Sequence, residues 1–315
     1  MHRGAIRTGL RVAALVAPLF VGACAPAGSA RKVDGALARL EQFGFVPQGR
    51  ASVELDLRRG AKPIEITEPL LVGMYEVTRA EFSRYCADAK PALDPLMRER
   101  MQDWTARDDS LPVSFITRSE AADFASWSGA RLLTGSEWLF CAISRRTFAY
   151  PWSDSWQQGR ANTLDLGLEP HAPTPVGTFE GGRTATHLYD MLGNVWEWVG
   201  DDSTGRVSPE AKATALGGSF LCYKTEIYRE GSFWAEPLES GSRLEDVGFR
   251  VCAPARAWLL AHAAELEQER DVRPRLEAIG RRWGPSAVAL LSELASSASG
   301  AARTSLEAIL SGARG

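Results

Sequence analysis

The sequence predicts an α+β fold, with a main domain of short strands, short helices and much irregular backbone, followed by a helical C-terminal end. Apolar and polar residues alternate at 53–57, which is the two-residue period of a half-buried strand. Glycine, proline, asparagine and short apolar runs dominate residues 151–250, which indicates loops and short strands. Residues 255–315 are rich in alanine, leucine, glutamate and arginine, and apolar side chains there recur at helical spacing.

Helix-start signals and strand-like runs place the first elements of the main domain. We expect a short helix at 33–42 and a second strand at 70–77. Thr78 with Glu81 three residues later has the pattern of a capping box, in which two side chains bond free backbone N–H groups of the first turn. This pattern predicts a helix at 78–87.

Two more helices are expected before the irregular region. Residues 117–128 place Phe124 and Trp127 on one face, and a glycine follows as the stop. A second capping pattern at 134–137 precedes a predicted helix at 138–143.

The tail is expected to contain two antiparallel helices separated by residues 296–301. Apolar residues at helical spacing define them: Ala287, Leu290, Leu291, Leu294, Leu306, Ile309 and Leu310. Such a pair resembles one unit of a helical repeat such as HEAT. One unit cannot bury its apolar face alone, so we expect it to pack on the main domain, with packing on a partner as the alternative.

The first residues are interpreted as a targeting signal and not as part of the fold. A basic start precedes an apolar run at 12–21 that is too short to span a bilayer. Val21-Gly-Ala-Cys24 resembles a bacterial lipobox, so we expect Cys24 to carry a lipid. An ordinary secretory peptide or a short membrane anchor is the alternative. The expected location is therefore the bacterial cell envelope, lipid-anchored and facing the periplasm or the exterior.

The domain organisation follows from these signals. We expect a lipoprotein signal peptide at 1–23, a tether with a short helix at 24–42, a main domain at 43–255 and a helical tail at 256–315.

Charge and cysteine content limit the function classes. The net charge is −3 and the basic residues are scattered, so no footprint for nucleic acid is visible. The four histidines lack metal-ligand spacing. After Cys24 four cysteines remain: Cys86, Cys141, Cys222 and Cys252. In an oxidising compartment they allow two disulfides in three pairings, so a free Cys222 cannot be assumed.

Two dense motifs lie close together in the irregular region. Residues 188–198 read LYDMLGNVWEW, and residues 217–222 read GGSFLC. With LLTGSEW at 132–138 and VGFR at 247–250, they resemble the formylglycine-generating enzyme (sulfatase-modifying factor) family. The resemblance covers about 43–255 and implies a C-type-lectin-like fold.

The resemblance places the catalytic question at Cys222. In catalytic members this cysteine and another five residues later bind copper(I) and oxidise a substrate cysteine to formylglycine. The second position here is Ile227. Copper(I) is soft, and one thiolate does not complete its nearly linear site. We therefore expect a membrane-anchored non-oxidase that serves as a binding or scaffolding module, with copper not expected.

The alternative function is a copper-dependent oxidase that acts on an exported sulfatase, with Cys222 as its catalytic residue. It would need a second sulfur from Cys252 or from the substrate.

The family's calcium ligands match Asp190, Gly193, Val195 and Glu197. The resemblance thus implies a structural calcium ion held by carboxylate and backbone oxygens; local pairing of the two acids without an ion is the alternative. A second calcium site would use Asn162 and the Thr163 carbonyl, with Asp165 as a substitute ligand.

The family's substrate groove matches Trp196 and Ser219. Trp196 is otherwise interpreted as a core residue. The expected partner is an exported protein or peptide.

Overall fold

The computed structural model describes residues 35–55, 61–143, 150–201, 213–229, 232–233 and 236–315. The predicted signal peptide, Cys24 and most of the tether lie outside these residues. Among the described helices, none combines the length and the apolar character needed to cross a bilayer.

One four-stranded antiparallel sheet joins distant parts of the chain. Its order is β1 (Phe43–Val46), β4 (Leu70–Gly73), β12 (Val251–Pro254) and β5 (Arg131–Leu132). The predicted strand at 70–77 ends at Gly73. The Met74 N–H still donates to Gln42 O beside β1, but the Val77 N–H donates to Phe249 O, outside this strand pair.

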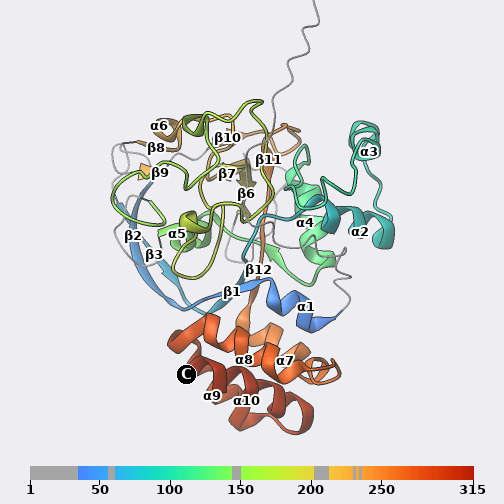
Figure 1. Ribbon diagram of the computed structural model, residues 1–315, viewed down its shortest axis with the longest axis vertical. Coiled ribbons are helices and arrows are strands. Elements are labelled where there is room, and N and C mark those ends of the chain that lie inside the picture. The colour runs from blue at the N-terminus through green and yellow to red at the C-terminus, as the bar shows by residue number, and fades with distance from the viewer. Residues whose placement is uncertain (1–34, 56–60, 144–149, 202–212, 230–231, 234–235) are drawn as a thin grey trace, which may run out of the picture. The chain divides into compact units, whose positions relative to one another are not determined.

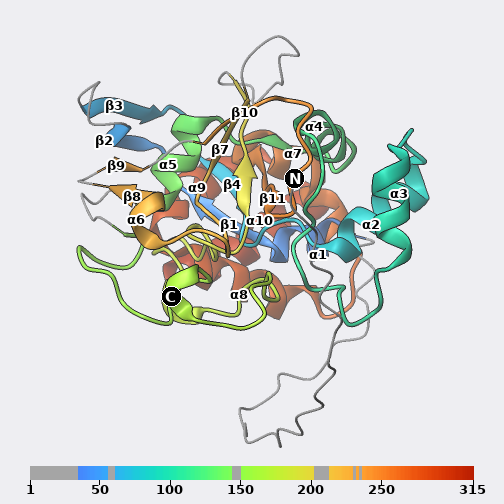
Figure 2. The same ribbon diagram turned by 90° about the horizontal axis from the view of Figure 1, so that it is seen from above.

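Two further four-stranded sheets complete the main domain (Figures 1 and 2). The first has the order β10 (Glu236–Leu238), β7 (Ala213–Leu216), β6 (Trp196–Trp198) and β11 (Val247–Gly248). The other has the order β3 (Ala61–Ile66), β2 (Gly49–Leu55), β9 (Ser232–Phe233) and β8 (Tyr228–Arg229). β2 includes most of the strand predicted from the alternation at 53–57.

Capping residues start three helices, and the sequence analysis predicts the capping pattern for two of them, α2 and α5. Thr78 and Glu81 form the capping box of α2 (Arg79–Ala89), and Thr117 forms another at α4 (Arg118–Trp127). In α5 (Gly135–Ile143) the Thr134 hydroxyl accepts from Glu137 N at 3.2 Å. Local hydrogen bonds of this kind involve residues three apart, which is why the sequence pattern predicts them.

The remaining helices of the main domain are short. They are α1 (Ala36–Glu41), α3 (Pro95–Gln102), α6 (Lys224–Ile227) and the 3₁₀ helices η1 (Leu164–Leu166) and η2 (Glu180–Gly182). Between residues 151 and 250 the described chain otherwise consists of short strands and loops, as the composition predicts.

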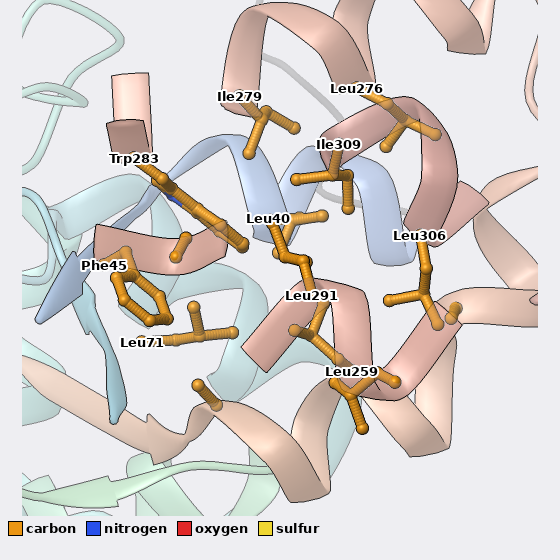
Figure 3. Packing of buried hydrophobic residues seen from close by; sticks show 14 of the residues in the cluster. Leu40, Phe45, Leu71, Leu259, Leu276, Ile279, Trp283, Leu291, Leu306 and Ile309 are labelled. Carbon is orange, nitrogen blue, oxygen red and sulfur yellow. The ribbon is translucent and has the colours of Figure 1, made fainter. Parts of the chain in front are cut away.

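The tail consists of α7 (Ala255–Leu266), α8 (Val272–Trp283), the 3₁₀ helix η3 (Gly284–Ala287), α9 (Val288–Ser297) and α10 (Gly300–Arg314). The predicted pair corresponds to α9 and α10, which are separated near residues 298–299. The tail packs on the main domain through one apolar cluster (Figure 3). Trp283 and Ile279 of α8 and Leu259 of α7 share this cluster with Phe45 and Leu71 of the first sheet.

Helix α1 is part of the contact between domain and tail. Leu37 and Leu40 are both 0% exposed and belong to the same cluster. The Arg275 guanidinium binds the Glu41 carboxylate through two 2.8 Å hydrogen bonds. The end of the predicted tether is therefore built into the core, and burial of each large side chain contributes on the order of 2 kcal/mol.

Candidate functional site

Cys222 lies in a loop between β7 and α6. Gly217 and Gly218 begin this loop with φ values of 103° and 77°, which glycine adopts without steric cost. Cys222 is half-buried, while its neighbours Leu221 and Tyr223 are 44% and 53% exposed. The backbone therefore brings the cysteine to the protein surface between two exposed apolar side chains.

A chain of polar contacts runs inward from the thiol. The Ser219 hydroxyl donates to Asp246 Oδ2 at 2.6 Å, and its oxygen is 3.4 Å from Cys222 Sγ. The Ser219 oxygen also accepts from Leu221 N at 3.1 Å, so contacts with Asp246 and Leu221 hold the serine hydroxyl beside the thiol.

The pKa of Cys222 is raised from its ordinary value, mainly because burial disfavours the thiolate. Hydrogen bonds from Ser219 act in the opposite direction, and the charges of Asp246 and Glu226 raise the pKa further. The thiolate is the form that binds soft metals and attacks electrophiles, so the raised pKa disfavours both roles for Cys222.

Ile227 occupies the position at which catalytic relatives are expected to carry the second cysteine. Its side chain is 1% exposed, and a Cβ built on Gly218 would overlap Ile227 Cγ1 and Cδ1. The isoleucine thus fills the space over Gly218 with carbon atoms. Cys252, the proposed substitute ligand, is fully buried and its sulfur accepts from Arg131 Nη1 at 3.1 Å. The residues around Cys222 do not fit a two-thiolate copper(I) site.

Glu197 is held by an internal cation. The Arg250 Nε lies 2.9 Å and 2.7 Å from the two carboxylate oxygens, and Nη2 lies 2.6 Å from Oε1. Trp138 Nε1 donates to Oε2 at 2.7 Å. Three N–H groups therefore contact the two carboxylate oxygens, and the single hydrogen of Arg250 Nε is shared between both oxygens. In this arrangement the Glu197 carboxylate does not fit the role of a calcium ligand, because the Arg250 guanidinium already neutralises its charge.

Asp190 and Glu76 lie in the same buried region. Asp190 Oδ2 accepts from Gly177 N at 2.6 Å, and burial raises the pKa of Asp190 to about 6. Glu76 accepts from Asn194 Nδ2 at 2.6 Å and from Val195 N at 3.1 Å. Burial raises the pKa of Glu76 well above its ordinary value, and the neighbouring acids add to the effect.

The second expected calcium site is engaged in protein contacts. Asn162 Nδ2 donates to Asn194 Oδ1 at 3.2 Å, and the Asn162 carbonyl accepts from Asn194 N. Asp165 Oδ2 accepts from Lys224 N at 2.6 Å. The Thr163 hydroxyl is buried and has no hydrogen-bond partner within the described residues.

Side chains alone do not assemble a metal centre in the described parts of the chain. No group of three or more histidine, cysteine, aspartate or glutamate side chains there could hold an ion. The Gly193 and Val195 carbonyls remain as expected ligands, so calcium at either site stays a prediction for metal analysis.

The two expected groove residues are both buried. Trp196 is 6% exposed and belongs to an apolar cluster, and Ser219 is 0% exposed. The structure brings Ser219 to Cys222 but gives Trp196 a core position; contact of either with a ligand stays a prediction.

An aromatic group lies near Cys222. The rings of Tyr150 and Trp152 stack at 5.7 Å, and Trp156 packs edge-on to Tyr150 at 5.6 Å. Lys224 Nζ lies 5.5 Å from the Trp156 ring centre. These rings and Cys222 pack against the same buried cluster, so aromatic surface lies beside the Cys222 loop.

Comparison with known proteins identifies the family of this chain. The model of the sulfatase-modifying factor enzyme 1-like domain matches residues 31–255. This chain belongs to that family. The match ends where the expected main domain ends and begins ahead of Phe43, which agrees with the burial of α1 in the core.

Relatives in this family differ in activity. The formylglycine-generating enzyme of Mycobacterium tuberculosis is 30% identical over 172 residues, which cover 45% of this chain and 57% of that protein. The inactive C-alpha-formylglycine-generating enzyme 2 of Mus musculus is 36% identical over 99 residues, which cover 28% of this chain and 32% of that protein. The matches thus span only part of these relatives.

A solved structure confirms the fold. PvdO from Pseudomonas aeruginosa matches with a TM-score of 0.54 at 18% identity, over 67% of this chain and 93% of that one. The predicted fold class, a formylglycine-generating-enzyme fold with a C-terminal helical region, is confirmed.

Sequence reasoning missed Glu76 and Asp246, and it quoted Arg250 only as part of a motif. A buried acid has no periodic signal, and its partners lie far away in the chain: Glu76 binds Asn194, and Asp246 binds Ser219. A charged residue inside an otherwise apolar run, as Glu76 is in the strand predicted at 70–77, is the one signal that could have drawn attention.

Proposed function

We propose that this chain is a non-oxidase member of the family that binds an extended segment of an exported protein at the surface around Cys222. The observation that carries the proposal is the buried Ile227 side chain against Gly218. It puts carbon where oxidation chemistry needs a second sulfur ligand, and Cys222 itself is held as a thiol.

The surface beside Cys222 has the composition of a binding site. Leu221, Tyr223 and Leu168 are 44%, 53% and 43% exposed. The loop that carries Leu168 is joined to the Cys222 loop, because Leu164 N donates to Cys222 O at 3.0 Å. Exposed apolar and aromatic side chains gathered in one place are typical of protein-binding surfaces. The adjacent Tyr150, Trp152 and Trp156 rings extend this surface.

The proposal includes attachment to the cell envelope through a lipid on Cys24. It rests on the lipobox-like Val21-Gly-Ala-Cys24 and is tested by the mass of the mature N-terminal peptide. A peptide that begins before Cys24, or one without lipid, contradicts attachment through this residue.

Copper loading tests the non-oxidase assignment. We expect no stoichiometric copper(I) binding in competition with a colorimetric chelator, and no aldehyde from a cysteine-containing peptide incubated with copper and oxygen. Ile227→Cys, which restores a second sulfur, is expected to raise copper(I) affinity at least about tenfold. The same variant with Cys222→Ser is the matched control. Aldehyde formation by the unmodified chain would establish the oxidase alternative instead.

Binding is tested with a library of extended peptides. Tyr223→Ala is expected to weaken binding of a selected peptide by about tenfold or more, because exposed aromatic residues contribute strongly to interfaces. Leu96→Ala is the matched control, since Leu96 is 57% exposed but lies on α3. Equal affinity of the Tyr223 variant and the unmodified chain would place the binding surface elsewhere.

A further inference from the structure

We propose that Cys141 and Cys252 form a disulfide that links α5 to β12 when the chain folds in an oxidising environment. All four described cysteines are thiols in the structure. The pairing is independent of the proposed binding function, and it leaves Cys86 and Cys222 as thiols.

Arg131 connects the two cysteine positions. Its Nη1 atom is 3.1 Å from Cys252 Sγ and 2.7 Å from Glu137 Oε2. The sulfur and that carboxylate oxygen are therefore no farther apart than these two distances together. Cys141 follows Glu137 by four residues in α5, which is one turn along the same helix face. Cys252 Sγ thus lies beside the helix face that carries Cys141.

The two thiols share one dry environment. Cys141 is 1% and Cys252 is 0% exposed, and both belong to the same apolar cluster. Burial raises the pKa of Cys141 well above its ordinary value, and the next cause is the charge of Cys252, ahead of those of Glu137, Arg250 and Glu197. That order agrees with Cys252 being a close neighbour. A disulfide needs Cβ atoms about 3.5–4.5 Å apart, which small side-chain adjustments between such neighbours can supply.

The other two cysteines are only half-buried, although Cys222 also packs against the cluster that contains Cys141 and Cys252. Cys86 lies in α2 and packs against a different apolar cluster. Cys222 lies in the surface loop, with its sulfur beside the Ser219 hydroxyl. The positions of the four cysteines therefore favour a disulfide between Cys141 and Cys252, and they leave Cys222 as a thiol in the surface loop.

The oxidation is a thiol–disulfide exchange with a small or protein disulfide, such as oxidised glutathione. The S–H bonds of Cys141 and Cys252 break, one S–S bond forms between them, and two electrons pass to the exchanging disulfide. Its S–S bond breaks, and its two sulfurs take up the two protons as thiols. Because both cysteines are buried in the folded chain, the exchange takes place during folding. Arg131 keeps its bidentate contact with Glu137.

Peptide mapping tests the pairing. The full chain is exported to an oxidising compartment or refolded with reduced and oxidised glutathione, then denatured and alkylated without reductant. We expect one cross-linked peptide pair that contains Cys141 and Cys252, with Cys86 and Cys222 alkylated. Recovery of Cys141 or Cys252 as an alkylated thiol, or in a pair with Cys86 or Cys222, overturns the proposal.

Thermal unfolding supplies a second, independent measurement. A disulfide that closes so long a loop is expected to raise the melting temperature by about 5–15 °C over the reduced chain. Reductant should lower the melting temperature of the unmodified chain and of Cys86→Ser, but not that of Cys252→Ala, whatever the starting stability of that variant. Insensitivity of the unmodified chain to reductant contradicts the proposal.

Discussion

Ile227 packs directly over Gly218, and a Cβ at position 218 would overlap the isoleucine side chain. Ile227 is 1% exposed and belongs to the main apolar cluster beneath the Cys222 loop. Ile227, which replaces the expected copper ligand, is therefore also a packing residue that helps to fix the shape of the Cys222 loop.

Ile227→Ala is expected to lower the free energy of unfolding by about 2–4 kcal/mol, because it removes buried methyl groups and leaves a cavity. Denaturant unfolding measures the change. Leu221→Ala, at a 44% exposed neighbour, is the control and should change it by less than about 0.5 kcal/mol. Similar losses in the two variants would contradict the packing role of Ile227.

Helices α8 and α10 approach each other through glycine. A Cβ on Gly312 would overlap the Glu277 carbonyl, and a Cβ on Gly280 would overlap that of Ile309. Gly312→Ala is therefore expected to destabilise the chain by about 1–3 kcal/mol as the helices are forced apart. Gly241→Ala is the control, since nothing lies within 4 Å of its Cβ position. A neutral Gly312 variant in thermal unfolding would show that the tail helices adjust freely.

The buried Arg250–Glu197 pair predicts a large effect of removing one charge. Glu197→Gln removes the carboxylate that pairs with the Arg250 guanidinium, which is 0% exposed at its side chain, and leaves Glu76 and Asp190 as the other acids that act on its charge. We expect a loss of about 3–5 kcal/mol in the free energy of unfolding. Glu307→Gln breaks the exposed pair with Arg303 and should cost less than about 1 kcal/mol. Comparable losses in urea unfolding would argue against the buried network.

Alkylation of Cys222 is expected to be slow at pH 8 and to accelerate as the pH rises. The raised pKa of Cys222 lowers the thiolate fraction at a given pH, and only the thiolate reacts. The rate is measured by peptide mass spectrometry after timed exposure to iodoacetamide, with the urea-unfolded chain as reference. Equal rates in folded and unfolded protein would contradict the raised pKa.

Variants identify the cause of this slow reaction. Asp246→Asn removes a charge that raises the Cys222 pKa, so its rate at pH 8 should exceed that of the unmodified chain. Ser219→Ala removes the side-chain hydrogen bond that lowers the pKa and keeps the backbone one, so its rate should fall. Equal rates in the unmodified chain and both variants would show that burial alone controls the thiol, and the opposite order would contradict these contacts.

Chelation tests the calcium expectation at Asp190, Gly193, Val195 and Glu197. The resemblance predicts that a chelator lowers the melting temperature, whereas the pairing of Glu197 with Arg250 predicts a change of less than about 1 °C. A bound ion would stabilise the folded chain by mass action, by about 2.7 kcal/mol at a hundredfold excess over its dissociation constant. A clear rise in melting temperature with added calcium, together with a stoichiometric ion in metal analysis, would establish the site.

Local patterns predicted much of the fold. The starts of α2 and α5 follow from capping residues three positions apart, α4 follows from its apolar face and the glycine after it, and α9 and α10 follow from helical periodicity. The strand predicted at 70–77 was too long, because Val77 pairs with Phe249 from the far end of the domain. Sequence alone has no signal for that partner.

The candidate site likewise combines features that the sequence predicts with contacts that only the structure shows. Ile227 and Cys222 could be judged from residue chemistry and a resemblance, since a side chain without sulfur cannot bind copper(I) in any fold. The partners of Glu197 could not be predicted from the sequence. Arg250 follows Glu197 by 53 positions, and the two side chains meet only in the folded domain.

By itself, the sequence determined the family motifs, the capped helices, the amphipathic tail and the absence of sulfur at position 227. These depend on residue identity or on hydrogen bonds and spacing within a few residues. Only the tertiary structure decided that Arg250 neutralises Glu197, that Asp246 orients Ser219 beside Cys222, and that the tail closes over α1 and the first sheet. Those contacts join distant segments, and they exist because burying apolar surface brings these segments together and leaves the polar groups among them to pair with one another.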